Sequence, residues 1–541
     1  MTAPSPERPP VLLPQDTSRI VGREAQRLNI AAARLVADAV RTTLGPKGMD
    51  KMLVDPLGDI TVTNDGVTIL REMRIEQPCA KMLVEIAATQ EREVGDGTTT
   101  AVVLAGELLA NAEQLLDRNI HPTVITRGYR LAAEHAQEAL AMIARPVRVE
   151  DHALLSQIAM TAMTGKGIEQ AREHLASLAV RAATAVAHRD GDRAAVDRSA
   201  IKLERAVGGR LEQSEILSGL LIDKERANPG MPGAVANARI ALIDAPLEIR
   251  NPEINASISI TDPRNLQGFL DMEEQMLREM VERVAASGAT VLLCQKGVDD
   301  LAGHLLAKRG ILCLRRVRKG DMERASAATG ARIVADLGDL TPDALGRAGE
   351  VVGMGIGDAS MTILRGLPGV RAATILVRGS TEHVVAEAQR ALEDAIGDVS
   401  AALVSGRVVA GAGAPELEVA RAVQAYAATL TGRERLAVRA FADAMEVVPR
   451  TLAENAGLDP IDVLTELKGA HGKGLTWAGV DVSTGKVMDA WDAGVLEPLS
   501  VKTRALASAV EVATLILRID DVIQAGKPDA VNGPPDGMFG E

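Results

Sequence analysis

The chain has 541 residues, of which 47% are hydrophobic and 25% charged, and its formal net charge is −13. This length exceeds that of one ordinary hydrophobic core, so we expect two to four domains. The acidic balance argues against non-specific binding to nucleic acid or to an anionic membrane surface. Aromatic residues make up only 1% of the chain, so the core must be packed with aliphatic side chains and methionine.

The three cysteines, Cys79, Cys294 and Cys313, form no CxxC pair. This odd number predicts neither a disulfide framework nor a structural zinc site, and it is typical of a reducing compartment. The proline-rich first 15 residues have no basic start and no long apolar run, so we expect a flexible arm and not a signal peptide. No apolar run approaches the roughly 20 residues that span a bilayer. The sequence therefore predicts a soluble, cytoplasmic protein, with a disordered tail at GKPDAVNGPPDGMFGE.

Helical patterns dominate the first 150 residues. An amphipathic pattern predicts a helix over 18–43, which ends at the Leu-Gly-Pro turn of 44–46. Two strands are expected next, KMLVD and DITVTNDGVTIL, with the Asn-Asp-Gly turn of 64–66 inside the second stretch. A further helix over 79–92 then leads to a glycine-rich loop.

That loop, VGDGTTT at 94–100, opens directly into a helix with apolar residues at helical spacing. Free backbone N–H groups at a helix start, together with three hydroxyls, make a ready site for phosphate. Asp96 adds an oxygen ligand of the kind that Mg²⁺ accepts when it shares phosphate. The alternative is an ordinary capped helix, with Asp96 or Thr98 as N-cap. The chain contains neither a G-x-x-x-x-G-K-[ST] motif nor a G-x-G-x-x-G motif after a strand, so a nucleotide would bind in another way.

The pattern changes after residue 150. Alanine-rich helices in 151–221 are interrupted by Thr-Gly-Lys-Gly at 164–167, whose lysine has a solvated loop position as its simplest interpretation. Strands and helices alternate in 222–372, which predicts a compact α/β unit. One helix there, running from Pro263 to about Ser287, carries Met272, Met276 and Met280 at four-residue spacing. Such a helix can pack on its own domain or offer an adaptable surface to partners.

A strand, a Gly-Ser-Thr turn and a helix follow at 374–399. Asp394 lies about 200° round this helix from Leu392 and hence off the apolar stripe, so it is either solvated or faces another segment. From residue 409 the chain again has the helical, Ala/Leu/Val-rich pattern of its first 150 residues. The simplest arrangement joins the two ends into one domain and inserts the middle between them.

These segments together resemble the group II, thermosome-type chaperonins. The resemblance covers residues ~18–525 and rests on TLGPKGMDKMLVD, TVTNDGVTIL, VGDGTTTAVVLAGELL, RALEDAIGDV, VAGAGAPELE, RTLAENAGLDP and VKTRALASAVEVATLILRIDDVI. It implies a multidomain α+β and α/β chaperonin fold with an equatorial ATPase domain (1–150 and 409–541), an intermediate domain (151–221 and 373–408) and an apical client-binding domain (222–372). The segment at about 250–287 would be a helical protrusion that serves as a built-in lid.

The resemblance also implies a function. Identical or paralogous subunits would form a double ring, and ATP hydrolysis would close a chamber in which non-native client proteins fold. ATP or ADP and Mg²⁺ would be the ligands, with no nucleic acid and no membrane as partner. The site residues carried over are Asp394 and Asp65 for catalysis, Asp96 for the metal, and Leu44, Gly45, Pro46, Gly97, Thr98, Thr99, Thr100, Gly165, Lys166, Gly411, Gly413, Glu497 and Lys502 for the nucleotide. Apolar candidates for client binding are Leu301, Leu305, Met276 and Met280.

Two departures from the family pattern concern this site. The usual three glycines are here Gly411-Ala412-Gly413, and the extra methyl crowds the nucleotide unless a negative φ accommodates it. Gly165 stands where relatives often carry a small hydroxyl residue. Two other classes of function remain: a passive ring scaffold or holdase with little ATP turnover, and a metabolic ATP-dependent transferase, for which we find no constellation of catalytic groups.

Overall fold

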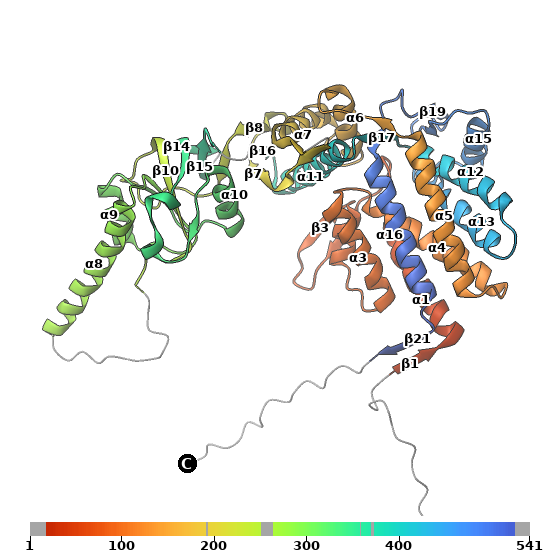
Figure 1. Ribbon diagram of the computed structural model, residues 1–541, viewed down its shortest axis with the longest axis horizontal. Coiled ribbons are helices and arrows are strands. Elements are labelled where there is room, and N and C mark those ends of the chain that lie inside the picture. Colours follow the sequence, from red (N-terminus) through yellow and green to blue (C-terminus); the bar gives the residue numbers. More distant parts are fainter. Residues whose placement is uncertain (1–17, 191–192, 250–262, 357–358, 369–372, 525–541) are drawn as a thin grey trace, which may run out of the picture.

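The computed structural model describes residues 18–190, 193–249, 263–356, 359–368 and 373–524. The N-terminal arm, the C-terminal tail and the first part of the expected lid, 250–262, lie outside the described residues. Figure 1 shows three blocks in a row: a helical block made from both ends of the chain, a small middle block, and a sheet-containing block from which one long helix projects.

The helical block draws on both ends of the chain. Its helices are α1 Gly22–Arg41, α2 Gly66–Glu72, α3 Pro78–Glu93, α4 Thr98–Asp117, α5 Pro122–Ile143, α12 Ala414–Thr429, α13 Glu434–Met445, α14 Val447–Asn455, α15 Pro460–Gly472 and α16 Leu499–Leu517. Its strands are β1 Ser18–Val21, β2 Lys51–Val54, β3 Ile60–Thr63, β4 Arg145–Pro146, β17 Arg407–Ala410, β18 Ala478–Val480, β19 Val487–Asp489, β20 Leu496–Pro498 and β21 Asp521–Gln524.

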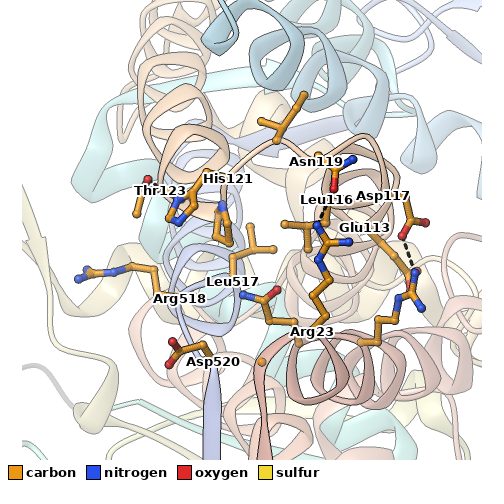
Figure 2. Close-up of a pocket in the computed structure, with 15 residues that line it drawn as sticks. Arg23, Glu113, Leu116, Asp117, Asn119, His121, Thr123, Leu517, Arg518 and Asp520 are labelled. Carbon is orange, nitrogen blue, oxygen red and sulfur yellow. Dashed lines mark hydrogen bonds and ion pairs between the residues drawn. The ribbon is translucent and has the colours of Figure 1, made fainter.

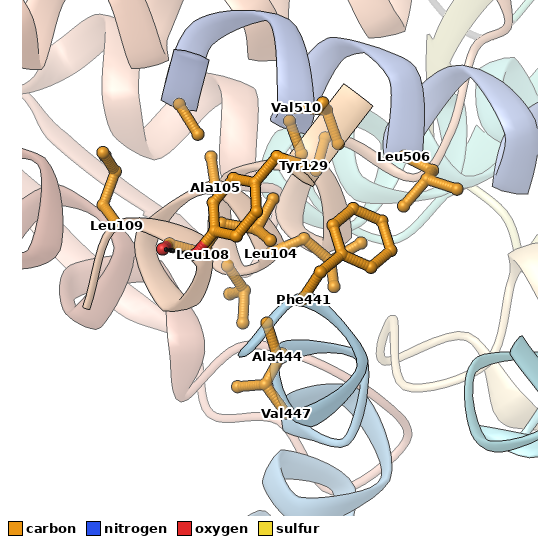
Figure 3. Close-up of a cluster of buried hydrophobic side chains, with 14 of the residues drawn as sticks. Leu104, Ala105, Leu108, Leu109, Tyr129, Phe441, Ala444, Val447, Leu506 and Val510 are labelled. Carbon is orange, nitrogen blue, oxygen red and sulfur yellow. Dashed lines mark hydrogen bonds between the residues drawn. The ribbon is translucent and has the colours of Figure 1, made fainter. Parts of the chain in front are cut away.

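The core of this block is aliphatic, as the composition predicts, and α4 runs through it. Leu104, Leu108 and Leu109 of α4 are buried against α13 and α16. Tyr129 and Phe441 meet edge to face with ring centroids 5.9 Å apart (Figure 3). The Tyr129 hydroxyl donates to the Leu108 carbonyl at 2.7 Å, which satisfies the one polar group of this aromatic pair.

Two details of the N-terminal third differ from the sequence prediction. The first helix begins at Gly22 and not at residue 18, because Ser18–Val21 pairs as an antiparallel strand with Asp521–Gln524 at the other end of the chain. The strand β3 ends at Thr63, and GVTIL forms helix α2 because Asp65 caps it. Periodicity alone cannot distinguish a short apolar strand from a short buried helix.

The middle block holds a three-stranded sheet in the order β7-β16-β8, in which β7 and β16 are parallel. It consists of α6 His152–Ala162, α7 Arg172–Val186, β5 Ala187–Asp190, β6 Arg193–Val196, β7 Ile201–Val207, β8 Glu215–Ser218, β16 Ala373–Gly379 and α11 Glu382–Ser405. Apolar residues of α6, α7 and α11 share one core with those of β16.

The third block is built on a seven-stranded sheet in the order β12-β11-β10-β14-β15-β9, with β13 paired to β10. Its elements are β9 Leu220–Ile222, β10 Ala234–Ile243, α8 Pro263–Ala286, β11 Val291–Cys294, α9 Asp300–Lys308, β12 Leu312–Leu314, α10 Lys319–Thr329, β13 Ile333–Val334, β14 Gly346–Ile356 and β15 Ala359–Arg365. Alternation did not predict β14, because its glycine-rich sequence GRAGEVVGMGI has a weak strand signal. The helix α8 projects from this block (Figure 1).

Candidate active site

The glycine-rich loop at 94–97 reaches α4 through a left-handed glycine. Gly97 has φ 78° and is the N-cap of α4, with no side-chain cap, so the expectation that Asp96 or Thr98 caps the helix is wrong. The Asp96 carboxylate instead accepts the Gly97 N–H at 2.6 Å. The start of α4 therefore keeps backbone N–H groups for an anion, beside the hydroxyls of Thr98, Thr99 and Thr100.

Two amide side chains that the sequence analysis did not select, buried Gln90 and half-buried Asn455, hold these loops. Gln90 donates to the Asp96 carbonyl at 2.9 Å and ties the loop to α16 through the Val501 carbonyl. Asn455 of α14 donates to the Leu44 carbonyl at 2.8 Å. Nothing in a single sequence distinguishes such an amide from a solvated one on a helix surface.

The turn at 44–46 requires its glycine. Gly45 has φ 82°, and a Cβ there would lie 2.2 Å from a methyl group of Leu452. The turn also touches the 164–167 segment, since a Cβ on Gly165 would lie 3.2 Å from the Gly45 carbonyl oxygen and from Pro46 Cα. Gly165 itself has φ 83°, which explains why glycine stands there without strain.

Asp65 lies beside the threonine-rich loop. A Cβ on Gly66 would be 2.5 Å from Thr99 Oγ1, so the 64–66 turn packs directly against Thr99. The Asp65 carboxylate accepts from the Thr68 N–H at 3.0 Å and from its hydroxyl at 2.6 Å, which fixes its orientation. Asn64 donates to the Gly165 carbonyl at 2.7 Å and so joins this turn to the loop that carries Lys166.

Lys166 and Asp394 form an ion pair at the same place, although α11 belongs to the middle block. Both side chains are largely buried, with 14% and 22% of their surface exposed. Burial raises the pKa of Asp394. The charge of Lys166 lowers this pKa and the charges of Asp96 and Asp65 raise it, and the net result is a pKa of about 8. Burial alone would lower the pKa of Lys166, but the carboxylates of Asp394, Asp96 and Asp65 outweigh it and raise that pKa. Three acids therefore surround one cation.

A glycine–glycine contact brings α11 onto the loop. A Cβ on Gly397 would lie 3.0 Å from Gly95 Cα, and a Cβ on Gly95 would lie 2.9 Å from Gly397 Cα. Neither position has room for a side chain at this separation. One turn of α11 thus lies directly on the backbone of the loop that carries Asp96.

Asp398 is a further acid of this site that the sequence analysis missed. It is fully buried, and among the described residues neither carboxylate oxygen has a hydrogen-bond partner that would satisfy it as an ion. Burial, followed by the charges of Asp96, Glu497 and Asp394, raises the pKa of Asp398 well above its ordinary value. A signal was available, because Asp398 follows Asp394 by one helical turn and interrupts an otherwise apolar stretch.

Glu497 and Lys502 form the opposite side of the site with Glu416 of α12. The Lys502 ammonium contacts Glu497 at 2.7 Å and Glu416 at 2.9 Å, and all three side chains are nearly enclosed. Thr100, Glu416 and Lys502 line one small cavity, which connects this cluster to the threonine-rich loop. Gly411 leaves room for Glu497, since a Cβ there would be 2.5 Å from Glu497 Oε1.

Ala412 departs from the family pattern in a strained conformation. Its φ is 56°, so the negative φ that would accommodate the methyl is not present. Its neighbour Gly413 has φ 79° and is the N-cap of α12, where a Cβ would lie 2.8 Å from Pro449 Cβ. Ala412 is held by a hydrogen bond from the Val480 N–H to its carbonyl at 3.0 Å. The strain lies in the segment that the resemblance places against the nucleotide.

The side chains selected for client binding have different surroundings. Leu301 and Leu305 of α9 are half-buried and pack against the core of the third block, as does Met280. Met276 is 45% exposed on α8, and Met272, one turn earlier, is 54% exposed. Among these residues the open apolar surface is therefore that of α8.

A cleft of about 550 Å³ lies at the far end of the helical block, between α1, the α4–α5 turn and the end of α16 (Figure 2). Arg23 donates to Asn119 and Arg27 pairs with Asp117 there. This cleft contains none of the predicted site residues. A second cleft, of about 990 Å³, lies beside Lys202 and Asp321, between the middle and third blocks.

The donor set suits magnesium. In the described part of the chain no three His, Cys, Asp or Glu side chains are grouped closely enough to hold a metal ion by themselves. Mg²⁺ differs from zinc here, since proteins commonly hold it with one or two carboxylates while phosphate and water fill the other positions. Asp96 beside a helix start fits that pattern.

A sequence profile described as the TCP-1/cpn60 chaperonin family matches residues 36–527. The chain belongs to this chaperonin family. A thermosome subunit of Methanopyrus kandleri is 58% identical over 515 residues, which cover 95% of this chain and 94% of the relative. The thermosome subunit beta of Archaeoglobus fulgidus is 56% identical, with 96% and 95% covered.

A solved chaperonin structure has the same fold. It is described as the open-state monomer of a group II chaperonin from Methanococcoides burtonii, and it matches with a TM-score of 0.64 at 44% identity, covering 79% of this chain and 100% of that chain. The resemblance to group II chaperonins, the chaperonin fold and the function of a thermosome-type chaperone subunit are therefore confirmed. Among the helices that the structure describes, none has the length and apolarity needed to cross a bilayer.

Proposed function

We propose that this chaperonin subunit hydrolyses ATP and that hydrolysis is coupled to the position of its middle block. The observation that carries the proposal is the Lys166–Asp394 ion pair, which lies against the loops of the helical block while α11 itself is part of the middle block. Phosphoryl transfer requires positioning, electrostatic stabilisation and an oriented water. An acid carried on a separate block supplies that orientation only when the blocks are docked.

Each predicted residue has a role in this proposal. The backbone of Leu44, Gly45 and Pro46, and that of Gly97 with Thr98, Thr99 and Thr100, would bind the phosphates, and Gly165 would leave room for them. Asp394 would orient the attacking water with help from Asp65, and Lys166 would contact the γ-phosphate. Gly411, Gly413, Glu497 and Lys502 would line the nucleoside end. Asp96 would hold Mg²⁺, which supplies charge neutralisation on the phosphates when bound.

The three blocks support the proposed division into domains. The core that joins residues 30–140 with 419–517 supports an equatorial ATPase domain made from both chain ends. We assign the middle block as the intermediate domain and the third block as the apical domain, with α8 in the helical protrusion. Exposed Met272 and Met276 on α8 support client binding at the protrusion more than at α9, whose leucines pack inward.

Assembly into a double ring is supported by two small sheets with open edges. The hairpin β2–β3 and the pair β1–β21 are separate two-stranded sheets among the described residues. Leu57 at the hairpin tip is 88% exposed, and Met52 is 67% exposed. Open edges and exposed apolar side chains mark surfaces that pair with another chain. A neighbouring subunit of this chain or a paralogue is the proposed partner.

The test combines turnover with closure. Purified assembly is incubated with ATP and Mg²⁺, phosphate release is measured, and protease protection of the apical block reports closure. We expect wild type to hydrolyse ATP and become protected, whereas Lys166→Ala binds ADP but turns over slowly. If wild type binds protein clients but neither hydrolyses ATP nor closes, the proposal is wrong and the passive-scaffold function takes its place.

A further inference from the structure

Among the residues that the structure describes, the buried acid Asp398 has no hydrogen-bond donor or cation that would stabilise its charge. Its side chain is fully enclosed, and no described donor reaches either carboxylate oxygen. An isolated buried carboxylate is strongly unfavourable, because it loses its hydration and gains nothing in return. A residue of this kind indicates that something absent from the polypeptide alone completes its surroundings.

The surroundings of Asp398 are acidic. The carboxyl of Asp96 lies within hydrogen-bonding reach of it, and Glu497 and Asp394 add further negative charge. Carboxylate oxygens only accept hydrogen bonds, so two of them meet favourably only when a proton or a cation lies between them. Asp96 is the residue that the proposed function already assigns to Mg²⁺.

The backbone brings the two acids together. The glycine–glycine contact between Gly95 and Gly397 places the residues that follow each glycine, Asp96 and Asp398, side by side. Asp398 also lies one turn after Asp394, on the same face of α11. The face of α11 that docks on the loop therefore carries two acids, and only Asp394 has a cationic partner.

We propose that Asp398 is a second carboxylate for the divalent cation held by Asp96, directly or through a metal-bound water. The cation would then be held from both the equatorial loop and the intermediate helix. Its release would weaken the contact between these two blocks, and its binding would strengthen it. This inference rests on the proposed nucleotide site.

The experiment measures metal binding and not turnover. Mn²⁺ replaces Mg²⁺, and the free Mn²⁺ signal is followed by electron paramagnetic resonance in the presence of saturating ADP. Wild type is compared with Asp398→Asn, which keeps the shape and can still donate a hydrogen bond to Asp96. Glu393→Gln on the same helix is the matched control, since Glu393 is exposed and bonds to Gln389.

We expect Asp398→Asn to weaken Mn²⁺ binding by about 10-fold or more, since the loss of even an outer-shell partner of a metal site has an effect of 10–100-fold. Glu393→Gln should bind as wild type does. Metal-free Asp398→Asn should melt at a higher temperature than metal-free wild type, because the amide avoids the cost of burying or protonating a carboxylate. Asp398→Ala has no amide that could hydrogen-bond to Asp96. It is measured in parallel and should show the same loss of Mn²⁺ affinity.

Three results would overturn the inference. Equal Mn²⁺ affinity of wild type and Asp398→Asn would show that the two acids share a proton and that Asp398 contacts no metal. If wild type binds ADP without any Mn²⁺ uptake, the metal assignment of Asp96 fails as well. If wild type binds no ADP, the proposed function itself fails, and that outcome is distinguishable because ADP binding is measured separately by calorimetry.

Discussion

Lys166 and Asp394 form an ion pair across 228 residues of sequence. The lysine lies on a turn that Asn64 fastens to the helical block, and the aspartate lies on α11 of the middle block. Both residues belong to the middle block, and the Asn64–Gly165 hydrogen bond brings their ion pair against the helical block at the point where phosphate is expected. In the proposed function, Asp394 would orient water only while α11 remains docked on the loop at Gly95.

Replacement of Asp394 by alanine should separate binding from chemistry. We expect ATP hydrolysis to fall by about 10²–10⁴-fold, the range for loss of a general acid–base group, while ADP affinity changes only a few-fold. Phosphate release and calorimetric titration measure the two quantities. Glu393→Gln is the control, and similar turnover of Asp394→Ala and wild type would contradict the assignment.

The strain at Ala412 predicts opposite effects for two neighbouring substitutions. Ala412→Gly relieves a left-handed alanine, worth about 1–2 kcal/mol, and loses about 0.4–1 kcal/mol through the more flexible unfolded chain. We expect a net stabilisation of about 0.5 kcal/mol. Gly413→Ala introduces both strain and a Cβ 2.8 Å from Pro449 Cβ, so it should destabilise by more than ~2 kcal/mol. Calorimetric melting of both variants tests this, and a lower melting temperature for Ala412→Gly would show that the methyl packs favourably.

Assembly should depend on the β2–β3 hairpin. Aspartate at Met52 and Leu57 places charge on the apolar surface that we propose pairs with a neighbour, and we expect single subunits in place of large particles. Native mass spectrometry measures the mass directly. Met142→Asp is the control, because this methionine is 78% exposed on α5, away from the hairpin. Intact rings in the double variant would refute this interface.

Stability below neutral pH should reveal the cluster in which buried Glu418 and His471 meet the exposed Arg421. Burial alone would raise the pKa of Glu418, but hydrogen bonds from Arg421 and His471 outweigh it and lower the pKa below 4.5. A lowered pKa stabilises the folded state above the unfolded value, and this contribution disappears as the pH falls through the folded value.

Glu418→Gln should therefore lower the melting temperature at pH 7, and the difference from wild type should shrink below pH ~4. The comparison is made in the same buffer series with Glu466→Gln, an exposed acid on α15. A difference that stays constant across the series would mean that the charge of Glu418 is not what stabilises the fold.

Residues with a local signature were predicted from sequence, and residues defined by distant neighbours were not. The helix end at 44–46, the glycine-rich loop before α4 and the candidate ligand Asp96 follow from composition and spacing, whereas the nucleotide roles of Gly45 and Gly97 rest on the family resemblance. Sequence alone predicts a turn at Asp65 and not the N-cap of a helix, because a four-residue strand and a seven-residue helix share the same apolar pattern.

The sequence analysis missed Gln90, Asn455 and Asp398 for a different reason. Each is a polar residue on a helix, and its role depends on which loop lies opposite, a relationship that periodicity does not contain. Asp394 was recognised as lying off the apolar stripe, yet only the fold shows that the free face meets Lys166. Similarly, the sign of φ at Ala412 depends on the backbone on either side of it and not on the residue type.

The shared core of the two chain ends also has a consequence for synthesis. Helices α4 and α5 bury their apolar faces against α12, α13 and α16, which leave the ribosome some 300 residues later. Until then the first quarter of the nascent chain has incomplete packing and exposes surface of the kind that aggregates. Contacts of such long sequence separation also form slowly. We therefore expect this chaperonin subunit to need a chaperone itself while it is being synthesised. Copies of the same subunit that have already assembled are natural candidates for that role.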